Sequence, residues 1–172
     1  MRVFLFKNNQ TFTLLVGTYR YFFLHFKELN EAMKRILIVG ENNACRSQMA
    51  EGWMRYYTRN YAEVVSAGLN KTSVDLAAAK SMSAAIIDIS KQSSKLIDEI
   101  EKDTFDFVIY TFASSATAQK TFNGNPKILI HPFELPVPSA NSKETNASYD
   151  KLRDEIENFC FDFVHANIRK LY

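Results

Sequence analysis

The stretch Ile36-Leu37-Ile38-Val39-Gly40-Glu41-Asn42-Asn43-Ala44-Cys45-Arg46-Ser47 sets the architecture of this chain. Its apolar start predicts a buried strand, because the strands of a parallel sheet are covered on both faces. A short polar loop follows, and a helix is expected to begin near Ser47, whose hydroxyl suits a helix N-terminus. Backbone N–H groups gathered at such a loop, the helix dipole and the permanent charge of Arg46 together favour binding of an oxyanion.

Apolar runs alternate with amphipathic stretches along the rest of the chain, and this pattern predicts an α/β fold with a parallel sheet. Strands are expected at residues 35–39, 63–67, 105–111 and 127–131. Helices are expected from Ser47 onward and at residues 74–86, 93–103, 113–122 and about 147–171. The pattern indicates neither an internal repeat nor a second folded domain.

The composition is that of a globular protein, with 172 residues of which 47% are hydrophobic. The net charge of +2 is too small to indicate binding to nucleic acid or to an anionic membrane. The two cysteines, Cys45 and Cys160, give neither a disulfide framework nor a metal-binding spacing. Their scarcity indicates a cytoplasmic protein in a reducing compartment.

Residues 1–32 differ from the rest because they are rich in Phe, Tyr and Leu. Their longest uncharged stretch, residues 8–19, is too short to span a bilayer, and they lack the pattern of a signal peptide. Met33 opens the first strand, so we expect the domain at residues 33–172. Residues 1–32 are then a disordered extension or the product of a start codon placed too early. A membrane-associating or docking extension is the alternative.

The segment from Asn43 to Trp53 reads Asn-x-Cys-Arg-Ser-Gln-Met-Ala-Glu-Gly-Trp, and Ser66-Ala67-Gly68 closes the second predicted strand. In the order and spacing of such segments, over nearly all of residues 33–172, the chain resembles the low-molecular-weight protein tyrosine phosphatases and the thioredoxin-coupled arsenate reductases. The resemblance implies a single α/β domain with a four-stranded parallel sheet and helices on both faces. It also implies an oxyanion site at Asn43, Arg46 and Ser47.

The chain departs from the pattern of these enzymes at the positions that perform their chemistry. The family has a nucleophilic cysteine, then five residues, then the loop arginine, and Gly40 stands in place of that cysteine. The general-acid aspartate is replaced by Val137, or by Leu135 if a gap is placed differently. The two resolving cysteines of the arsenate reductases correspond to Phe112 and about Gln119. None of these side chains can supply the missing nucleophile, proton or disulfide.

We therefore expect a catalytically inactive relative. Two interpretations of the loop remain: it binds phosphate, arsenate or a phosphorylated protein weakly, or it is a relic turn without a ligand. The second is considered because Glu41 places a carboxylate in the loop and Asn42 stands where the family has glycine. One alternative is an active phosphatase or arsenate reductase with an unrecognised nucleophile. Another is a protein-interaction module in which the loop has no role.

No cofactor is required under this interpretation. By resemblance to the arsenate reductases, a potassium ion could bind Asn43, Glu51, Ser66 and Asp88, whose oxygen atoms suit a hard cation. The alternative is that these residues form a hydrogen-bond network that holds the loop without a metal. Cys45 lies beside an arginine and a helix N-terminus, which predicts a lowered thiol pKa, although a packed loop residue is the preferred interpretation.

Overall fold

The computed structural model describes residues 33–59, 61–100, 102–114, 120–137 and 139–169. The chain divides into two units, Met1–Met33 and Lys34–Tyr172, and all elements named below belong to the second. The expectations for residues 1–32 lie outside the described residues. No helix in the described part of the chain is long and apolar enough to cross a membrane.

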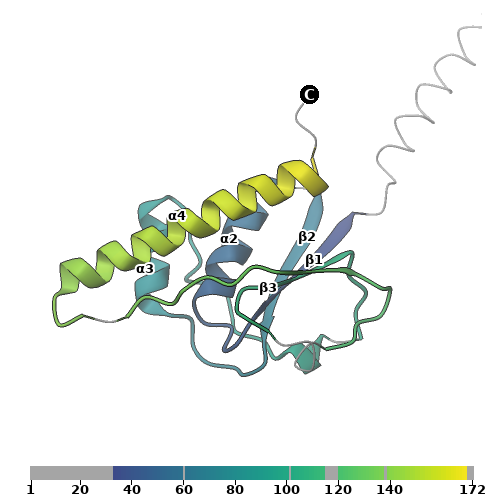
Figure 1. Ribbon diagram of the computed structural model, residues 1–172, viewed down its shortest axis with the longest axis horizontal. Helices are drawn as coiled ribbons and strands as arrows, with labels where there is room; N and C mark the ends of the chain where they lie inside the picture. Colours follow the sequence, from purple (N-terminus) through teal and green to yellow (C-terminus); the bar gives the residue numbers. More distant parts are fainter. Residues whose placement is uncertain (1–32, 60, 101, 115–119, 138, 170–172) are drawn as a thin grey trace, which may run out of the picture. The chain divides into compact units, whose positions relative to one another are not determined.

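Four parallel strands form the sheet of the second unit (Figure 1). They are β1 (Lys34–Gly40), β2 (Ala62–Gly68), β3 (Phe107–Tyr110) and β4 (Lys127–Ile130). The strand order is β2-β1-β3-β4, so β1 is central and its end at Gly40 lies beside the end of β2. The predicted α/β fold with a four-stranded parallel sheet is confirmed.

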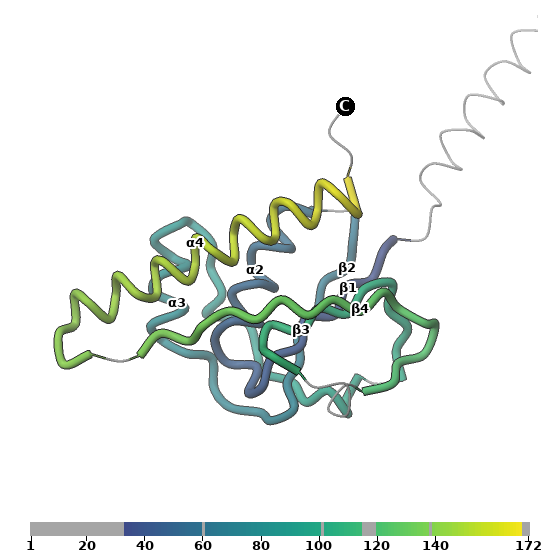
Figure 2. Tube along the Cα trace, viewed as in Figure 1, coloured from purple at the N-terminus to yellow at the C-terminus, as the bar shows by residue number. Residues whose placement is uncertain are grey.

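In the described part of the chain, three helices share one core with a face of this sheet: α2 (Arg46–Thr58), α3 (Leu76–Ala84) and α4 (Ser142–Asn167). Figures 1 and 2 show α4 as the longest of them, with the chain that follows β4 running along it. Ile36 and Ile38 of β1 are fully buried in the core that these helices form. The alternation of side chains along a strand sends the intervening residues to the other face.

The opposite face is covered by a single 3-10 turn, η1 (Ile97–Glu99), and by the segments around it in the described part of the chain. Leu37 and Val39 of β1 are fully buried there and pack in one cluster with Phe105 and Phe122. Both faces of β1 are therefore dry, as its apolar sequence predicts.

The prediction of a helix at residues 93–103 is wrong, because the described part of this range contains only the 3-10 turn η1. The N–H of Gly68 donates to the carbonyl of Lys95 (2.9 Å), and Leu96 forms an isolated bridge with Gly68. These contacts hold the residues before η1 in an extended path beside the end of β2. Half of the helix expected at residues 113–122 lies outside the described residues, and the described residues at its two ends are not helical.

The N-termini of α3 and α4 are set by capping side chains. Helix α3 is shorter than expected and begins after Asp75, whose carboxylate accepts hydrogen bonds from two backbone N–H groups of the first turn. Helix α4 begins earlier than the expected residue 147, because Asn141 caps it by accepting from the N–H of Lys143 (3.0 Å). A buried apolar stripe runs along this helix and includes Leu152, Ile156, Cys160 and Phe163.

Candidate functional site

The candidate site is the loop of residues 40–47, which joins β1 to α2 at the carboxyl edge of the sheet. Asn43 has a φ of 46°, a left-handed conformation that asparagine adopts more readily than most residues. Its neighbour Asn42, which stands where the family has glycine, does not adopt this conformation. The loop is fastened to the end of β2, where the N–H of Leu69 donates to the carbonyl of Gly40 (3.2 Å).

Ser47 occupies the space into which a side chain at position 40 would project. A Cβ built on Gly40 would lie 2.4 Å from Ser47 Oγ and 2.9 Å from Ser47 Cβ. The expectation that Ser47 caps α2 is wrong, since it lies inside the helix and is buried. Cys45 is the N-terminal flanking residue of α2 and makes no side-chain capping bond. The loop therefore leaves no space for a side chain at position 40 unless Ser47 moves.

Arg46 is engaged by two groups of the protein itself. Its Nη2 pairs with the carboxylate of Glu41 at 2.5 Å, and its Nη1 donates to the carbonyl of Phe133 at 2.9 Å. Its side chain is only 10% exposed, whereas that of Glu41 is 49% exposed. The guanidinium predicted to receive an oxyanion thus already holds an anionic oxygen, in the charge-assisted geometry that it would use for a ligand.

Asn43 links the loop to three parts of the chain. Its Nδ2 donates to Ser47 Oγ (3.1 Å) and to Ser66 Oγ (2.8 Å), and its Oδ1 accepts from Gln48 Nε2 (3.1 Å) and from the Lys95 N–H (2.8 Å). Every polar atom of this buried amide is therefore satisfied. Sequence analysis assigned no role to Gln48, although it lies in the quoted segment from Asn43 to Trp53, and none to Lys95, whose contact with Asn43 spans 52 positions of the chain.

Glu51 carries the buried negative charge of the network, with a side chain that is 1% exposed. Its Oε2 accepts from the N–H (2.8 Å) and the hydroxyl (2.5 Å) of Ser66. Its Oε1 pairs with Arg55 at 2.7 Å, and Lys95 Nζ lies 3.9 Å from Oε2. A buried carboxylate is tolerated only when such partners compensate its charge, and here the chain supplies two cations.

The residues around Glu51 do not fit a potassium ion. Asn43, Glu51 and Ser66 come together as predicted, but the cationic groups of Arg55 and Lys95 already surround the carboxylate. Asp88 is exposed instead, and its carboxylate accepts from the N–H of Ser90 (2.9 Å). Hydrogen bonds from Ser90 lower the pKa of Asp88. The arrangement corresponds to the alternative prediction, a network that holds the loop.

A second loop, residues 131–137, approaches the first through the contact between Arg46 and the carbonyl of Phe133. Val137 is 82% exposed and Leu135 is 50% exposed, and neither side chain can donate a proton. Phe112 is buried in the cluster beneath the sheet, where its ring lies 5.8 Å from that of Tyr110. Gln119 lies outside the described residues.

The Cys45 thiol is buried, and burial raises its pKa to about 12. The negative charge of Asp75 adds to this increase, while Arg46 opposes it. The prediction of a lowered pKa is wrong, because desolvation outweighs the nearby positive charge. The preferred interpretation of a packed residue agrees with this burial.

Residues 35–171 match the family model described as low molecular weight phosphotyrosine protein phosphatase. The chain belongs to this family. Arsenate reductase from Bacillus subtilis is 32% identical over 134 residues, which cover 77% of this chain and 96% of that protein. Arsenate reductase from Halalkalibacterium halodurans is 33% identical over 124 residues, covering 72% and 89%.

Solved structures give the same family resemblance. An arsenate reductase in its oxidised state superposes with a TM-score of 0.68 at 25% identity, over 78% of this chain and 98% of the other. A low molecular weight protein tyrosine phosphatase from T. tengcongensis superposes with a TM-score of 0.65 at 22% identity, over 77% and 99%. The second likeness concerns the fold alone.

Proposed function

We propose that this chain is a non-catalytic member of its family that binds a tetrahedral oxyanion weakly at the 40–47 loop. The observation that supports this most directly is Gly40 at the end of β1, with Ser47 filling the space in front of it. Covalent catalysis requires an attacking side chain at that point, and glycine has none.

The rest of the site offers no replacement for the lost groups in the described part of the chain. Cys45 is buried, and its pKa of about 12 keeps the thiol protonated at neutral pH. Val137 is an exposed valine where the family pattern has its general acid. These features favour an inactive relative over an active enzyme with an unrecognised nucleophile.

Weak oxyanion binding is supported by the elements that do not depend on the nucleophile. The N-terminus of α2, its backbone N–H groups and Arg46 still meet at one loop. A solved relative, 25% identical, is described as an arsenate reductase in the phosphate binding state. Glu41 competes for Arg46, so we propose a millimolar affinity for phosphate or arsenate, about −4 kcal/mol. The phosphate group of a phosphorylated protein would present the same oxyanion to the loop. The two free cysteines suit a reducing compartment such as the cytoplasm, where we propose that the protein acts.

The experiment has two arms, turnover and binding. Hydrolysis of p-nitrophenyl phosphate and thioredoxin-coupled reduction of arsenate should not exceed a control without the protein. Turnover that Arg46→Ala abolishes would overturn the proposed inactivity, since contamination would not respond to that change. In a phosphate titration followed by NMR, amides of residues 41–47 should shift in the wild type and not in Arg46→Ala. The absence of shifts in the wild type would leave an interaction module with a relic loop.

A further inference from the structure

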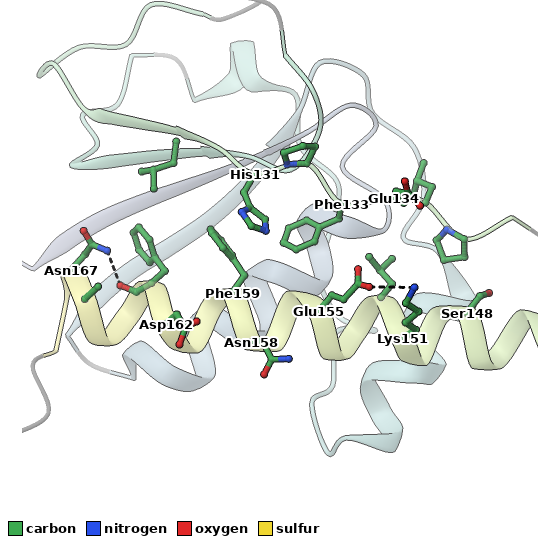
Figure 3. Close-up of a pocket in the computed structure, with 17 residues that line it drawn as sticks. His131, Phe133, Glu134, Ser148, Lys151, Glu155, Asn158, Phe159, Asp162 and Asn167 are labelled. Carbon is green, nitrogen blue, oxygen red and sulfur yellow. Dashed lines mark hydrogen bonds and ion pairs between the residues drawn. The ribbon is translucent and has the colours of Figure 1, made fainter.

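A groove of about 820 Å³ separates α4 from β4 and the loop that follows it (Figure 3). Its floor is apolar and includes Leu129, Phe133, Leu152, Phe159 and Phe163. The ring of His131 stacks on Phe159 with 4.3 Å between ring centroids, which continues the floor toward the end of β4. The groove is thus open along its length between a strand and a helix.

The strand that borders this groove is an open edge of the sheet. The N–H groups of Lys127 and His131 donate to β3, at 2.9 Å from the carbonyls of Asp106 and Tyr110. Because backbone groups alternate in direction along a strand, the N–H and C=O groups of Ile128 and Ile130 point away from β3. They form no hydrogen bond with another strand of the described sheet.

The exposure of β4 contrasts with the other edge of the sheet. In β2 five of the seven residues are buried, and its end is bridged by Leu96. In β4 no residue is buried, and the side chains of Ile128 and Ile130 are 42% and 45% exposed. An exposed apolar edge strand is a template for pairing with a further strand.

Charge on the rim of the groove narrows the choice of partner. Three carboxylates, Glu134, Glu155 and Asp162, line it together with one ammonium, that of Lys151. Lys151 pairs with Glu155 at 3.6 Å, which leaves Glu134 and Asp162 without an ion pair to any described residue. The rim therefore carries a net negative charge that a basic segment would complement.

We propose that the groove and the β4 edge bind an extended segment of a partner protein in which apolar residues alternate with Lys or Arg. The segment pairs with the outward backbone groups of Ile128 and Ile130 and so extends the sheet. Its apolar side chains enter the groove, and its basic side chains meet Glu134 and Asp162. Main-chain hydrogen bonds give such strand addition its affinity, and the groove gives it specificity. This inference is independent of the proposed oxyanion binding, because no residue of the 40–47 loop takes part.

The test uses a synthetic peptide in which valine alternates with lysine, titrated into the labelled full chain and followed by NMR. Shifts are expected in β4, in residues 131–136 and on the groove side of α4. Ile130→Pro removes one outward N–H but keeps the bonds to β3, since edge strands accept proline there. Its matched control, Ile130→Ala, loses the side chain and keeps the N–H. The proline variant should bind about fivefold more weakly than the alanine variant. Equal binding by the two overturns strand addition.

The charge argument is tested on the surface of α4, at two aspartates whose side chains are exposed. Asp162→Lys should weaken the peptide about tenfold, whereas Asp154→Lys, the same change on the same helix outside the groove, should not. If both variants lose the same peptide affinity, the effect comes from the net charge of the protein, and the assigned site is overturned. Sedimentation of the wild type as a dimer that Ile130→Pro dissociates would assign the edge to a second copy and also overturn the proposal.

Discussion

The carboxylate of Glu41 lies 2.5 Å from the guanidinium of Arg46, within the loop where the family pattern leads one to expect a bound oxyanion. Arg46 is nearly buried, while Glu41 is half exposed. The Glu41 carboxylate therefore occupies the position at Arg46 that an anionic ligand would take. Because the carboxylate is partly solvated, the interaction that an external anion would have to displace is of modest strength.

Glu41→Gln is expected to strengthen phosphate binding about three- to tenfold. The substitution removes both the competing charge at Arg46 and the repulsion between the carboxylate and the incoming anion. The measurement is the phosphate titration followed through the amides of residues 41–47. Glu63→Gln is the matched control, because it removes a carboxylate paired with Arg35 at 2.8 Å, on another arginine. An unchanged affinity in Glu41→Gln would mean that the carboxylate does not compete with phosphate for Arg46.

Gly40→Ala is expected to lower the free energy of unfolding by about 1–3 kcal/mol, because the added methyl overlaps Ser47. In the Ser47→Gly background this overlap is absent. Gly40→Ala should then leave the free energy of unfolding unchanged or raise it slightly, because alanine lowers the conformational entropy of the unfolded chain. Urea unfolding of the two single variants and the double variant measures this coupling. If Gly40→Ala unfolds at the wild-type urea concentration, Ser47 moves freely and the space in front of residue 40 is not filled.

Cys45 is expected to resist alkylation in the folded protein. Its pKa is about 12, so the thiolate that attacks iodoacetamide is scarce at pH 8. Because the folded pKa lies above the ordinary value of 9.0, the contribution of this group to stability is complete below pH 9 and is lost as the pH rises toward 12. Mass spectrometry of digested samples, labelled with and without urea, reports the modified cysteine. Rapid native labelling of Cys45 at pH 7 would contradict the assigned burial.

The features that sequence could predict are those set by local pattern. The four strands follow from apolar runs, and the glycine at position 40, at the end of the first strand, is visible in the sequence itself. The stripe on α4 likewise follows from helical spacing at Leu152, Ile156 and Cys160. Each of these depends on residues close together in the chain, which is where periodicity carries information.

The contacts that shape the site come from distant parts of the chain. Arg46 meets the carbonyl of Phe133 across 87 positions, and Asn43 meets the N–H of Lys95 across 52. The latter contact also requires an extended path, which overrides the helical spacing of apolar residues at 93–103. The Cys45 pKa was misjudged for a related reason: the charge beside it is visible in sequence, but its burial depends on the whole fold.

The last prediction concerns the cations around Glu51. Because Arg55 and Lys95 already meet the charge of the buried carboxylate, the melting temperature should agree within about 1 °C in potassium chloride and in sodium chloride of equal ionic strength. Arg55→Met should lower the free energy of unfolding by about 2–3 kcal/mol, and Lys95→Met by about 1 kcal/mol, since Lys95 lies farther from the carboxylate.

Lys91→Met is the matched control for these variants. Lys91 lines a pocket that Glu51, Arg55 and Lys95 also line, but it forms no ion pair with Glu51 among the described residues. It should change the free energy of unfolding by less than about 0.5 kcal/mol. Differential scanning calorimetry in the two salts measures all three variants and the wild type. A wild-type melting temperature that rises with potassium and not with sodium would show that a metal ion enters beside Glu51, and the two side-chain cations would then not be sufficient.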